Sequence, residues 1–298
     1  MIMSEFLTTR EVAALLRVKE RKVYDLVAGG AIPFRKVTGK LLFPQSEISD
    51  WMRTTLAGTS TGAGTSEART ELPKVFAGGH DPLLEWALRR SRSGIASFLD
   101  GALDGVERAR RNDCMAAGLH IPEAEGAWNV GTVRAAFAGE PWVLVEWVKR
   151  RRGLILAPDL VRAPRRLAET RGLRFQARQP EAGSQLVLAE LLRREKMTEG
   201  DLRFVDGCER SETDLAGAVA AGRAEVGLGI EAAARQCGLR FVPLIEERFD
   251  LLVARKQWFD PPFQTFWRFC GEPEFAEKAR ALGGYDLSGF GTVHFNGD

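Results

Sequence analysis

Apolar residues in the first fifty positions recur with the spacing of short amphipathic helices. Two sets lie at positions i, i+3 and i+4 and so share one helix face: Val12, Leu15 and Leu16 in the first set, and Val23, Leu26 and Val27 in the second. This spacing predicts one helix over residues 10–17 and another over residues 19–28. Thr8 or Thr9 can cap the first helix, and Gly29 with Gly30 can end the second.

The pattern changes to alternation after the second helix. The segment FRKVTGKLLFP, residues 34–44, alternates around a Thr-Gly pair and predicts a β-hairpin. Ser46 can then cap a third helix that buries Ile48, Trp51 and Met52. Two short helices joined by a tight turn and followed by a hairpin match winged helix-turn-helix geometry. We therefore expect a small helical winged helix-turn-helix domain over residues 1–53.

A second pattern begins at Leu72, where apolar runs of β type alternate with helical segments. Alternation of this kind predicts βαβ units and a mostly parallel sheet. The length of this part suits an α/β domain of two lobes better than one with a single core. The predicted strands are KVFAGG, GIASF, CMAAGLHI, GLILAP, LRFQAR, AEVGLGI, RFVPLI and FDLLVAR, and the predicted helices are DPLLEWALRR, GALDGVERARRN, GSQLVLAELLRRE and DLAGAVAAG.

Composition separates the two parts and indicates a compartment. Residues 54–71 are rich in Gly, Ser and Thr, which predicts a flexible linker. The chain has 298 residues, of which 45% are hydrophobic and 28% charged, and no apolar run approaches the roughly 18 residues of a membrane span. The N-terminus lacks the basic start and apolar stretch of a secretory signal, so we expect a cytoplasmic protein.

Charge is distributed unevenly between the two parts. Residues 1–53 contain nine Lys and Arg against six Asp and Glu, a balance of +3. The remainder contains 33 against 34, a balance of −1. The basic excess therefore lies in the predicted helix-turn-helix domain, although the asymmetry is mild.

The N-terminal part resembles the excisionase-type, or MerR-like, winged DNA-binding domain. The resemblance rests on LTTREVAALLRV, KVYDLVAGGAIPFRKV and FPQSEISDWM, and it covers residues 5–52. It implies that the start of the second helix meets base edges in the major groove, while the hairpin meets phosphates or the minor groove. The expected DNA-binding residues are Thr9, Lys19, Glu20, Arg21, Lys22, Tyr24, Arg35, Lys36 and Lys40.

Residues 72–298 resemble the type 2 periplasmic-binding-protein fold in its cytosolic form, and the related molybdate and tungstate binding proteins. The resemblance rests on GGHDPLLEWAL, SFLDGALDGVERARRNDCMAAGLHI, EPWVLVEWVKRRRGLILAP, RFQARQPEAGSQLVLAELL, TDLAGAVAAGRAEVGLGIEAAA and LGGYDLSGFGTV. It implies two lobes, one of about residues 72–155 and 248–298 and another of about residues 156–247. It also implies a ligand between them, either an oxoanion such as molybdate or tungstate or a small organic, pterin-type metabolite. The residues it places there are His80, Asp81, Ser97, His120, Ala182, Gly183, Ser184, Gln185, Thr213 and Asp214, and Glu212 precedes the same helix as the last two.

Two departures from the family pattern count against a bare dianion. Where the family's turn offers Ser, Thr and Arg, this chain has Ala182, Ser184 and Gln185, so a charge-assisted partner for an anion is lost. Asp100 and Glu181 also place negative charge beside two helix starts. An organic ligand is therefore the alternative to an oxoanion.

No motif indicates catalysis or metal binding. The chain contains no GxSxG, HExxH or P-loop motif, and GLGIEAA lacks the third glycine of a dinucleotide-binding turn. The four cysteines form no CxxC pair and predict buried thiols, not a zinc site. The run VKRRRG, residues 148–153, is interpreted as a solvated helix end. We therefore expect no enzyme, no metal and no required cofactor.

These patterns together predict a ligand-responsive transcription regulator. Its expected partners are double-stranded DNA and a small-molecule effector, and its expected state is a homo-oligomer, a dimer or a tetramer, without membrane contact. Two alternatives stay open. One is a cytosolic small-molecule binding or cofactor-delivery protein, and the other is an excisionase-like architectural factor that does not respond to ligand.

Overall fold

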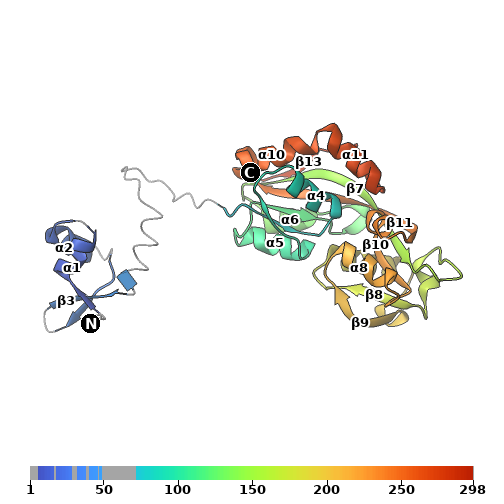
Figure 1. Ribbon diagram of the computed structural model, residues 1–298, viewed down its shortest axis with the longest axis horizontal. Helices are drawn as coiled ribbons and strands as arrows, with labels where there is room; N and C mark the ends of the chain where they lie inside the picture. The colour runs from blue at the N-terminus through green and yellow to red at the C-terminus, as the bar shows by residue number, and fades with distance from the viewer. Residues whose placement is uncertain are drawn as a thin grey trace. The chain divides into compact units, whose positions relative to one another are not determined.

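The computed structural model describes residues 6–16, 18–28, 32–37, 40–45, 47–48 and 72–297 (Figure 1). The chain divides into two compact units, residues 1–70 and 71–298. The predicted linker, Trp51 and Met52 lie outside the described residues. None of the described helices is long and apolar enough to cross a membrane.

The N-terminal unit joins two short helices to a three-stranded antiparallel sheet. Its elements are β1 (Phe6–Thr8), α1 (Thr9–Leu16), α2 (Glu20–Ala28), β2 (Arg35–Val37) and β3 (Lys40–Pro44), and the strand order is β1-β3-β2. The two predicted helices and the predicted hairpin are therefore confirmed. Thr8 caps α1, because its hydroxyl accepts from the Glu11 amide at 3.3 Å while the Glu11 carboxylate accepts from the Thr8 amide at 2.7 Å.

A small apolar core holds this unit together. Val12, Val23, Phe43 and Ile48 are fully buried in it. Leu15 was expected on the same helix face as Val12, but it is 49% exposed. The buried face of α1 is thus narrower than the apolar spacing predicts.

The larger unit begins with alternating strands and helices that form its first lobe, lobe I. These are β4 (Val75–Gly78), α4 (Pro82–Arg90), β5 (Ala96–Phe98), α5 (Ala102–Arg110) and β6 (Ala116–Leu119). The strands β5, β4 and β6 pair in parallel in that order, as the alternation predicts. A short helix, α6 (Val130–Ala136), follows β6.

Two long strands connect the lobes. β7 (Trp142–Leu156) and β11 (Arg240–Ala254) pair antiparallel along their length, and the whole sheet has the order β5-β4-β6-β11-β7-β10-β8-β9. RFVPLI and FDLLVAR were expected as two strands, but both belong to β11. The register of β11 shifts between Pro243 and Ile245, so the strand continues through the proline without ending.

The second lobe, lobe II, repeats the strand–helix alternation. Its elements are β8 (Arg174–Arg178), α7 (Gly183–Arg194), β9 (Arg203–Glu209), α8 (Glu212–Ala220), β10 (Val226–Ile230) and α9 (Glu231–Gln236). β8 lies between β9 and β10 and pairs in parallel with both. The helices α7 and α8 begin directly after the strands β8 and β9, so their N-termini face the same edge of the sheet.

The chain then returns to lobe I. α10 (Pro261–Cys270) and α11 (Pro273–Leu282) lie with α4 on one face of the sheet, and α5 and α6 lie on the other (Figure 1). Two short strands, β12 (Tyr285–Asp286) and β13 (Val293–Asn296), pair with β7. Single helical turns occur at Ala124–Gly126, Leu167–Thr170, Glu199–Asp201 and Gln257–Phe259.

The interpretation of VKRRRG as a solvated helix end is wrong. The run lies in β7, where alternate side chains point to opposite faces. Arg150 and Arg152 are at most 1% exposed, whereas the side chain of Arg151 between them is 50% exposed. The buried arginines are stable there because buried carboxylates face them.

Candidate functional site

Exposed charged side chains gather at the start of α2 in the N-terminal unit. Val23 is buried beneath the helix, so the residues around it on the other face are left to solvent. An exposed basic helix start is the feature with which helix-turn-helix domains reach base edges. The predicted DNA-contact residues that are exposed here are Lys19, Glu20, Arg21, Lys22 and Tyr24.

The hairpin carries the remaining predicted DNA contacts. Arg35 and Lys36 are exposed on β2, and Arg35 Nη2 donates to Glu47 Oε1 at 2.6 Å. Lys40 begins β3, but its side chain lies outside the described part. Thr9 is the first residue of α1 and is half-buried. Of these residues, Lys36 is the better placed to meet phosphate, because Arg35 is already paired.

The larger unit contains a cluster of ionised side chains where its lobes meet. We call it the charge cluster. Each member is at most 5% exposed. Three members are arginines and three are carboxylates: Arg150, Arg152, Arg178, Asp81, Glu212 and Glu247.

Glu247 lies at the centre of this cluster. Its carboxylate accepts from Arg150 Nε at 2.5 Å and from Arg152 Nε at 2.8 Å. Arg150 Nη1 also donates to Asp81 Oδ2 at 2.7 Å, and Tyr285 Oη donates to the same oxygen at 2.9 Å. Asp81 in turn caps α4 by accepting from the amides of its first turn.

Glu212 connects the cluster to the start of α8 in lobe II. Its carboxylate accepts from Arg152 Nη2 at 2.8 Å, and Arg178 Nη1 lies 3.1 Å from it. Its backbone amide donates to His80 Nδ1 of lobe I at 3.2 Å. A helix start that could hold an anion is therefore already bonded to the protein's own groups.

Burial and pairing set the protonation of these groups. Burial alone would raise the pKa of Glu212, but Arg152 and Arg178 outweigh it and hold the pKa at about 2. Burial opposes ionisation of Glu247 too, yet Arg150 and Arg152 keep its pKa well below its usual range. The cluster thus pairs three guanidinium groups with three carboxyl groups, so its formal charges balance.

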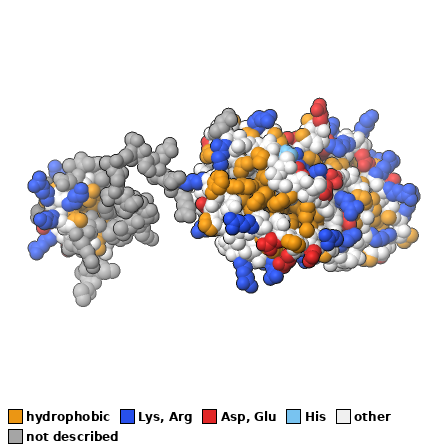
Figure 2. Space-filling model, turned by 90° about the horizontal axis from the view of Figure 1, so that it is seen from above, with side chains coloured by type: hydrophobic (Ala, Val, Ile, Leu, Met, Phe, Trp, Pro, Cys, Tyr) orange, Lys and Arg blue, Asp and Glu red, His pale blue; other side chains and the backbone are white. Residues whose placement is uncertain are grey.

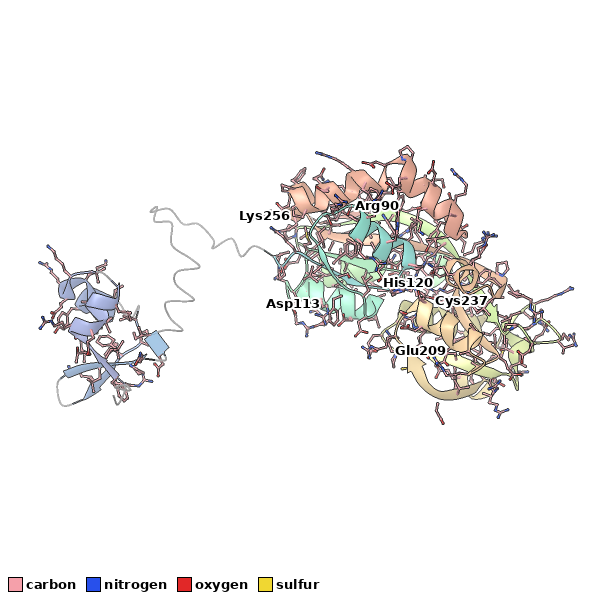
Figure 3. All side chains as sticks on the ribbon, in the orientation of Figure 1. Arg90, Asp113, His120, Glu209, Cys237 and Lys256 are labelled. Carbon is pink, nitrogen blue, oxygen red and sulfur yellow. The ribbon has the colours of Figure 1, made fainter. Side chains whose placement is uncertain are left out.

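His120 lies beside this cluster at the join of the lobes (Figure 3). It is 2% exposed, its ring stacks on Phe249, and its Nδ1 is 3.4 Å from Glu247 Oε2. Burial lowers the pKa of His120 to about 4, although Glu247 opposes the shift. The imidazole is therefore neutral at pH 7.

A hollow of about 410 Å³ opens between the lobes next to the charge cluster. Lobe I contributes His80, Glu85, Ser97 and Leu99 to its lining, and lobe II contributes Ser211, Thr213 and Asp214. Two larger hollows, of about 520 and 730 Å³, lie along the 159–169 loop of lobe II, where Val161 is fully exposed. We regard the interlobe hollow as the better candidate because both lobes and several polar side chains converge on it.

Direct bonds also close the lobes on each other. Arg210 of lobe II forms an ion pair with Asp100 of lobe I, in which Nε donates to Oδ1 at 2.9 Å. The backbone amide of Leu103, in the first turn of α5, donates to the carbonyl of Glu181, just before α7, at 3.2 Å. The negative charge of Asp100, expected to oppose an anion, is thus compensated by Arg210.

The structure divides the ten predicted ligand residues into three groups. Four of them line the hollow: His80, Ser97, Thr213 and Asp214. Five are buried around the charge cluster or in the join between the lobes: Asp81, His120, Ala182, Gly183 and Ser184. Gln185 points elsewhere, because its amide donates to Glu199 within lobe II at 3.1 Å.

Sequence reasoning missed the arginines of the charge cluster and Glu247. For two of these residues, Arg150 and Arg152, the sequence pattern does indicate burial. In WVLVEWVKRRRGLIL, apolar residues flank the cations on both sides, which is typical of one buried strand and places every second cation inward. Arg178 and Glu247 carry no comparable signal, since their partners lie far away in the sequence.

The comparisons with known proteins agree with this architecture. The model of the PBP superfamily domain matches residues 85–271, and a helix-turn-helix domain model matches residues 6–55. The uncharacterized protein YvgK of Bacillus subtilis (strain 168) is 25% identical over 96% of each chain. An uncharacterized protein from the 5′ region of a 2Fe-2S ferredoxin gene of Clostridium pasteurianum is 31% identical over a segment that covers 30% of this chain and 82% of the Clostridium protein.

Two solved structures share the fold at low identity. An OxyR C206 mutant of Corynebacterium glutamicum has a TM-score of 0.50 at 15% identity, with 92% of this chain and 88% of that chain covered. The second is a putative phosphate ABC transporter substrate-binding protein of Clostridium perfringens with bound phosphate. It has a TM-score of 0.51 at 10% identity, with 70% of this chain and 96% of that chain covered. Identity this low relates the architectures alone.

Proposed function

Because the chain belongs to the PBP superfamily and carries a helix-turn-helix domain at its N-terminus, we propose that it is a ligand-responsive transcription regulator. The observation that carries the proposal is the joining of an exposed basic helix start, at α2, to a two-lobed unit with a polar hollow between its lobes. The first unit binds duplex DNA, and the second binds an effector. Two copies on neighbouring half-sites would multiply the affinity, so the proposal includes a dimer.

The hollow favours an uncharged or cationic effector that bears hydroxyl or amine groups. Its hydroxyls, from Ser97, Ser211 and Thr213, can donate and accept hydrogen bonds. Its seven lining residues include Glu85 and Asp214 but no Lys or Arg. An oxoanion would meet these two carboxylates, while the nearby arginines already pair with carboxylates: Arg89 with Glu85, Arg210 with Asp100, and the three arginines within the charge cluster. This supports a small organic metabolite over molybdate or tungstate.

Effector binding would act by shifting a population. A molecule that binds both walls of the hollow is held more tightly when the lobes are closed, and it can shift the equilibrium only by that difference in affinity. The bonds between Asp100 and Arg210 and between Leu103 and Glu181 stabilise closure without an effector. A cofactor-delivery role is the main alternative, and it differs in requiring no DNA affinity.

DNA binding is tested by titrating the full chain with duplexes tiled from the region upstream of its own gene. We expect Arg21→Ala to weaken binding by about 1–3 kcal/mol if it reaches a base edge, and the logarithm of affinity to fall steeply with salt. Arg203→Ala, which removes an exposed arginine from lobe II, is the matched control and should leave binding unchanged. Equal affinities for wild type and Arg21→Ala, or no binding at low salt, would contradict the proposal.

The effector class is tested by thermal unfolding of the full chain against two panels. One contains sugars, polyamines and pterins, and the other contains molybdate, tungstate and phosphate. A member of the first panel should raise the unfolding temperature in a concentration-dependent way, because a ligand of the native state stabilises it by mass action. Stabilisation by an oxoanion alone would overturn the preference for an organic effector but leave the regulator proposal standing.

A further inference from the structure

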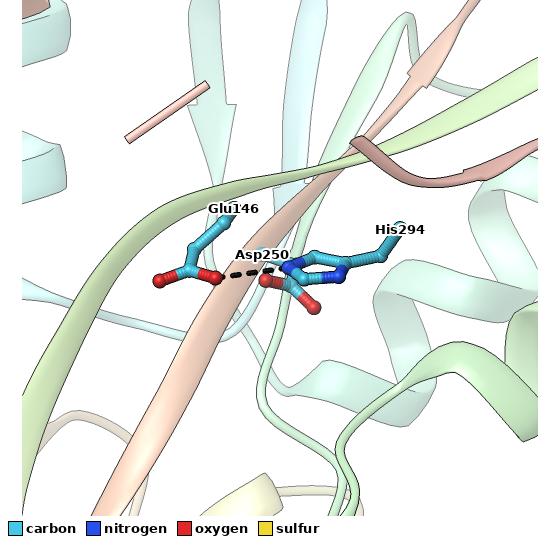
Figure 4. Close-up of side chains that lie close together, drawn as sticks. All are labelled: Glu146, Asp250 and His294. Atoms are coloured by element: carbon cyan, nitrogen blue, oxygen red, sulfur yellow. Dashed lines mark hydrogen bonds and ion pairs between the residues drawn. The ribbon is translucent and has the colours of Figure 1, made fainter. Parts of the chain in front are cut away.

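Three side chains from adjacent strands converge in lobe I, away from the interlobe hollow. They are Glu146 of β7, Asp250 of β11 and His294 of β13 (Figure 4). Asp250 is the register partner of Glu146, and β13 pairs with the other edge of β7. One ligand atom from each residue lies within 4.8 Å of the others. The sheet therefore presents one imidazole and two carboxylates at a single point.

The hydrogen bonds around these side chains leave coordinating capacity unused. His294 Nε2 is 2.9 Å from Glu146 Oε2, whereas Glu146 Oε1 is buried without a hydrogen-bond partner in a side chain of which 6% is exposed. Gly289 lies against this oxygen, since a Cβ there would be 1.8 Å from it. A buried carboxylate oxygen without a donor is unfavourable unless a cation or a proton is nearby.

Charge is also incompletely compensated at this point. Arg248 Nε donates to Asp250 at 3.0 Å, and Asn129 Nδ2 donates to Asp250 Oδ2 at 2.8 Å. Among the described residues, Arg248 is the one lysine or arginine that pairs with Asp250 or Glu146, and His294 is the other partner. The carboxylates of Glu146 and Asp250 thus face one guanidinium and one imidazole.

We propose that Glu146, Asp250 and His294 bind a divalent first-row transition-metal ion. One nitrogen and two carboxylate oxygens are the donors of Zn²⁺ and related ions, and three protein ligands leave a position for water or a further ligand. The imidazole disfavours Mg²⁺ and Ca²⁺, which prefer oxygen donors. Binding requires the Nε2 proton to leave or move to Nδ1, so that Nε2 coordinates in place of its hydrogen bond to Glu146. The ion would fasten the C-terminal strand β13 to β7 and β11.

The proposal is tested with the full chain after treatment with chelator, by calorimetric titration with Zn²⁺ and by absorption with Co²⁺. We expect one equivalent to bind, to raise the unfolding temperature, and to give a Co²⁺ spectrum without thiolate charge transfer. His294→Ala and Glu146→Gln should each weaken binding at least about tenfold. Glu140→Gln, an exposed carboxylate just before β7, is the control and should bind like wild type.

Three results would overturn the site. The first is the absence of stoichiometric Zn²⁺ or Co²⁺ binding to the wild type, and the second is undiminished binding by both variants. A thiolate band would assign the metal to a cysteine, such as the exposed Cys208, and would also overturn it. Circular dichroism of each metal-free variant shows whether it is folded. If His294→Ala does not fold, the milder variant Glu146→Gln still decides the test. The outcome does not depend on DNA or effector binding.

Discussion

His120 is enclosed on two sides by glycines that belong to different lobes. A Cβ at Gly79 of lobe I would lie 2.8 Å from the ring, and a Cβ at Gly183 of lobe II would lie 2.5 Å from it. The ring thus occupies the space that a methyl group at either position would need. Because the imidazole is buried beside Arg150 and Arg152, it resists a second proton even though Glu247 favours one. Protonation of His120 would therefore place an unfavourable charge at the contact between the lobes.

The pKa of His120 predicts a loss of stability in mild acid. Its folded pKa of about 4 lies below the ordinary 6.5, so between these values the unfolded chain binds a proton that the folded chain does not. Stability then falls as pH decreases from 6.5 towards 4, by about 2 kcal/mol between pH 7 and pH 5 from this residue. The contribution of His120 is measured by urea unfolding of the wild type and of His120→Gln at pH 7 and at pH 5. It is the difference between the two proteins in how much the free energy of unfolding changes with pH. If the variant loses as much stability as the wild type, the assignment is wrong.

The strand pair β7–β11 explains why two cations of VKRRRG, Arg150 and Arg152, are buried. Their register places Glu247 opposite Arg150, and the side chains of Arg150 and Arg152 meet its carboxylate from the same face of the sheet. Glu246, one residue earlier, points to the other face and is exposed. Removing one partner from a buried pair of this kind costs about 3–5 kcal/mol, because it leaves an uncompensated charge. The two strands are held together by this cluster as well as by their backbone bonds.

The elements that local spacing determines could be predicted from the sequence. The two N-terminal helices, the hairpin and the βα alternation of lobe I each follow from periodicity within about ten residues, and all are confirmed. The sequence did not predict that RFVPLI and FDLLVAR form one strand, because a proline after an apolar run indicates a break in the strand. The resemblance to binding proteins found four residues of the hollow, but the charge cluster depends on pairs such as Asp81 with Arg150 that no local pattern reveals.

At the scale of the whole molecule, our proposal requires that lobe closure and DNA affinity be linked. The structure suggests a way to alter closure without an effector. Gly183 is the first residue of α7 and has no left-handed backbone, so alanine suits its local conformation. Its new methyl group would collide with the ring of His120, which is buried and stacks on Phe249. Gly183→Ala is therefore expected to act as a wedge that separates the lobes.

The separation of the lobes is checked by small-angle X-ray scattering of the full chain, with each variant compared with the wild type. Gly217→Ala provides the matched control, because Gly217 lies within α8 of the same lobe and a Cβ there meets nothing within 4 Å. We expect Gly183→Ala to increase the radius of gyration and Gly217→Ala to leave it unchanged. A folded Gly183→Ala chain of unaltered radius would mean that His120 rearranges instead.

The most direct test of the account is the dissociation constant for DNA of these three proteins, the wild type, Gly183→Ala and Gly217→Ala, on one duplex at one salt concentration. Coupling between sites is typically about 1–3 kcal/mol. We therefore predict that Gly183→Ala changes the dissociation constant at least fivefold, while Gly217→Ala matches the wild type. Three identical constants, with scattering showing that the lobes of Gly183→Ala have separated, would contradict a regulator whose DNA binding follows the state of its lobes.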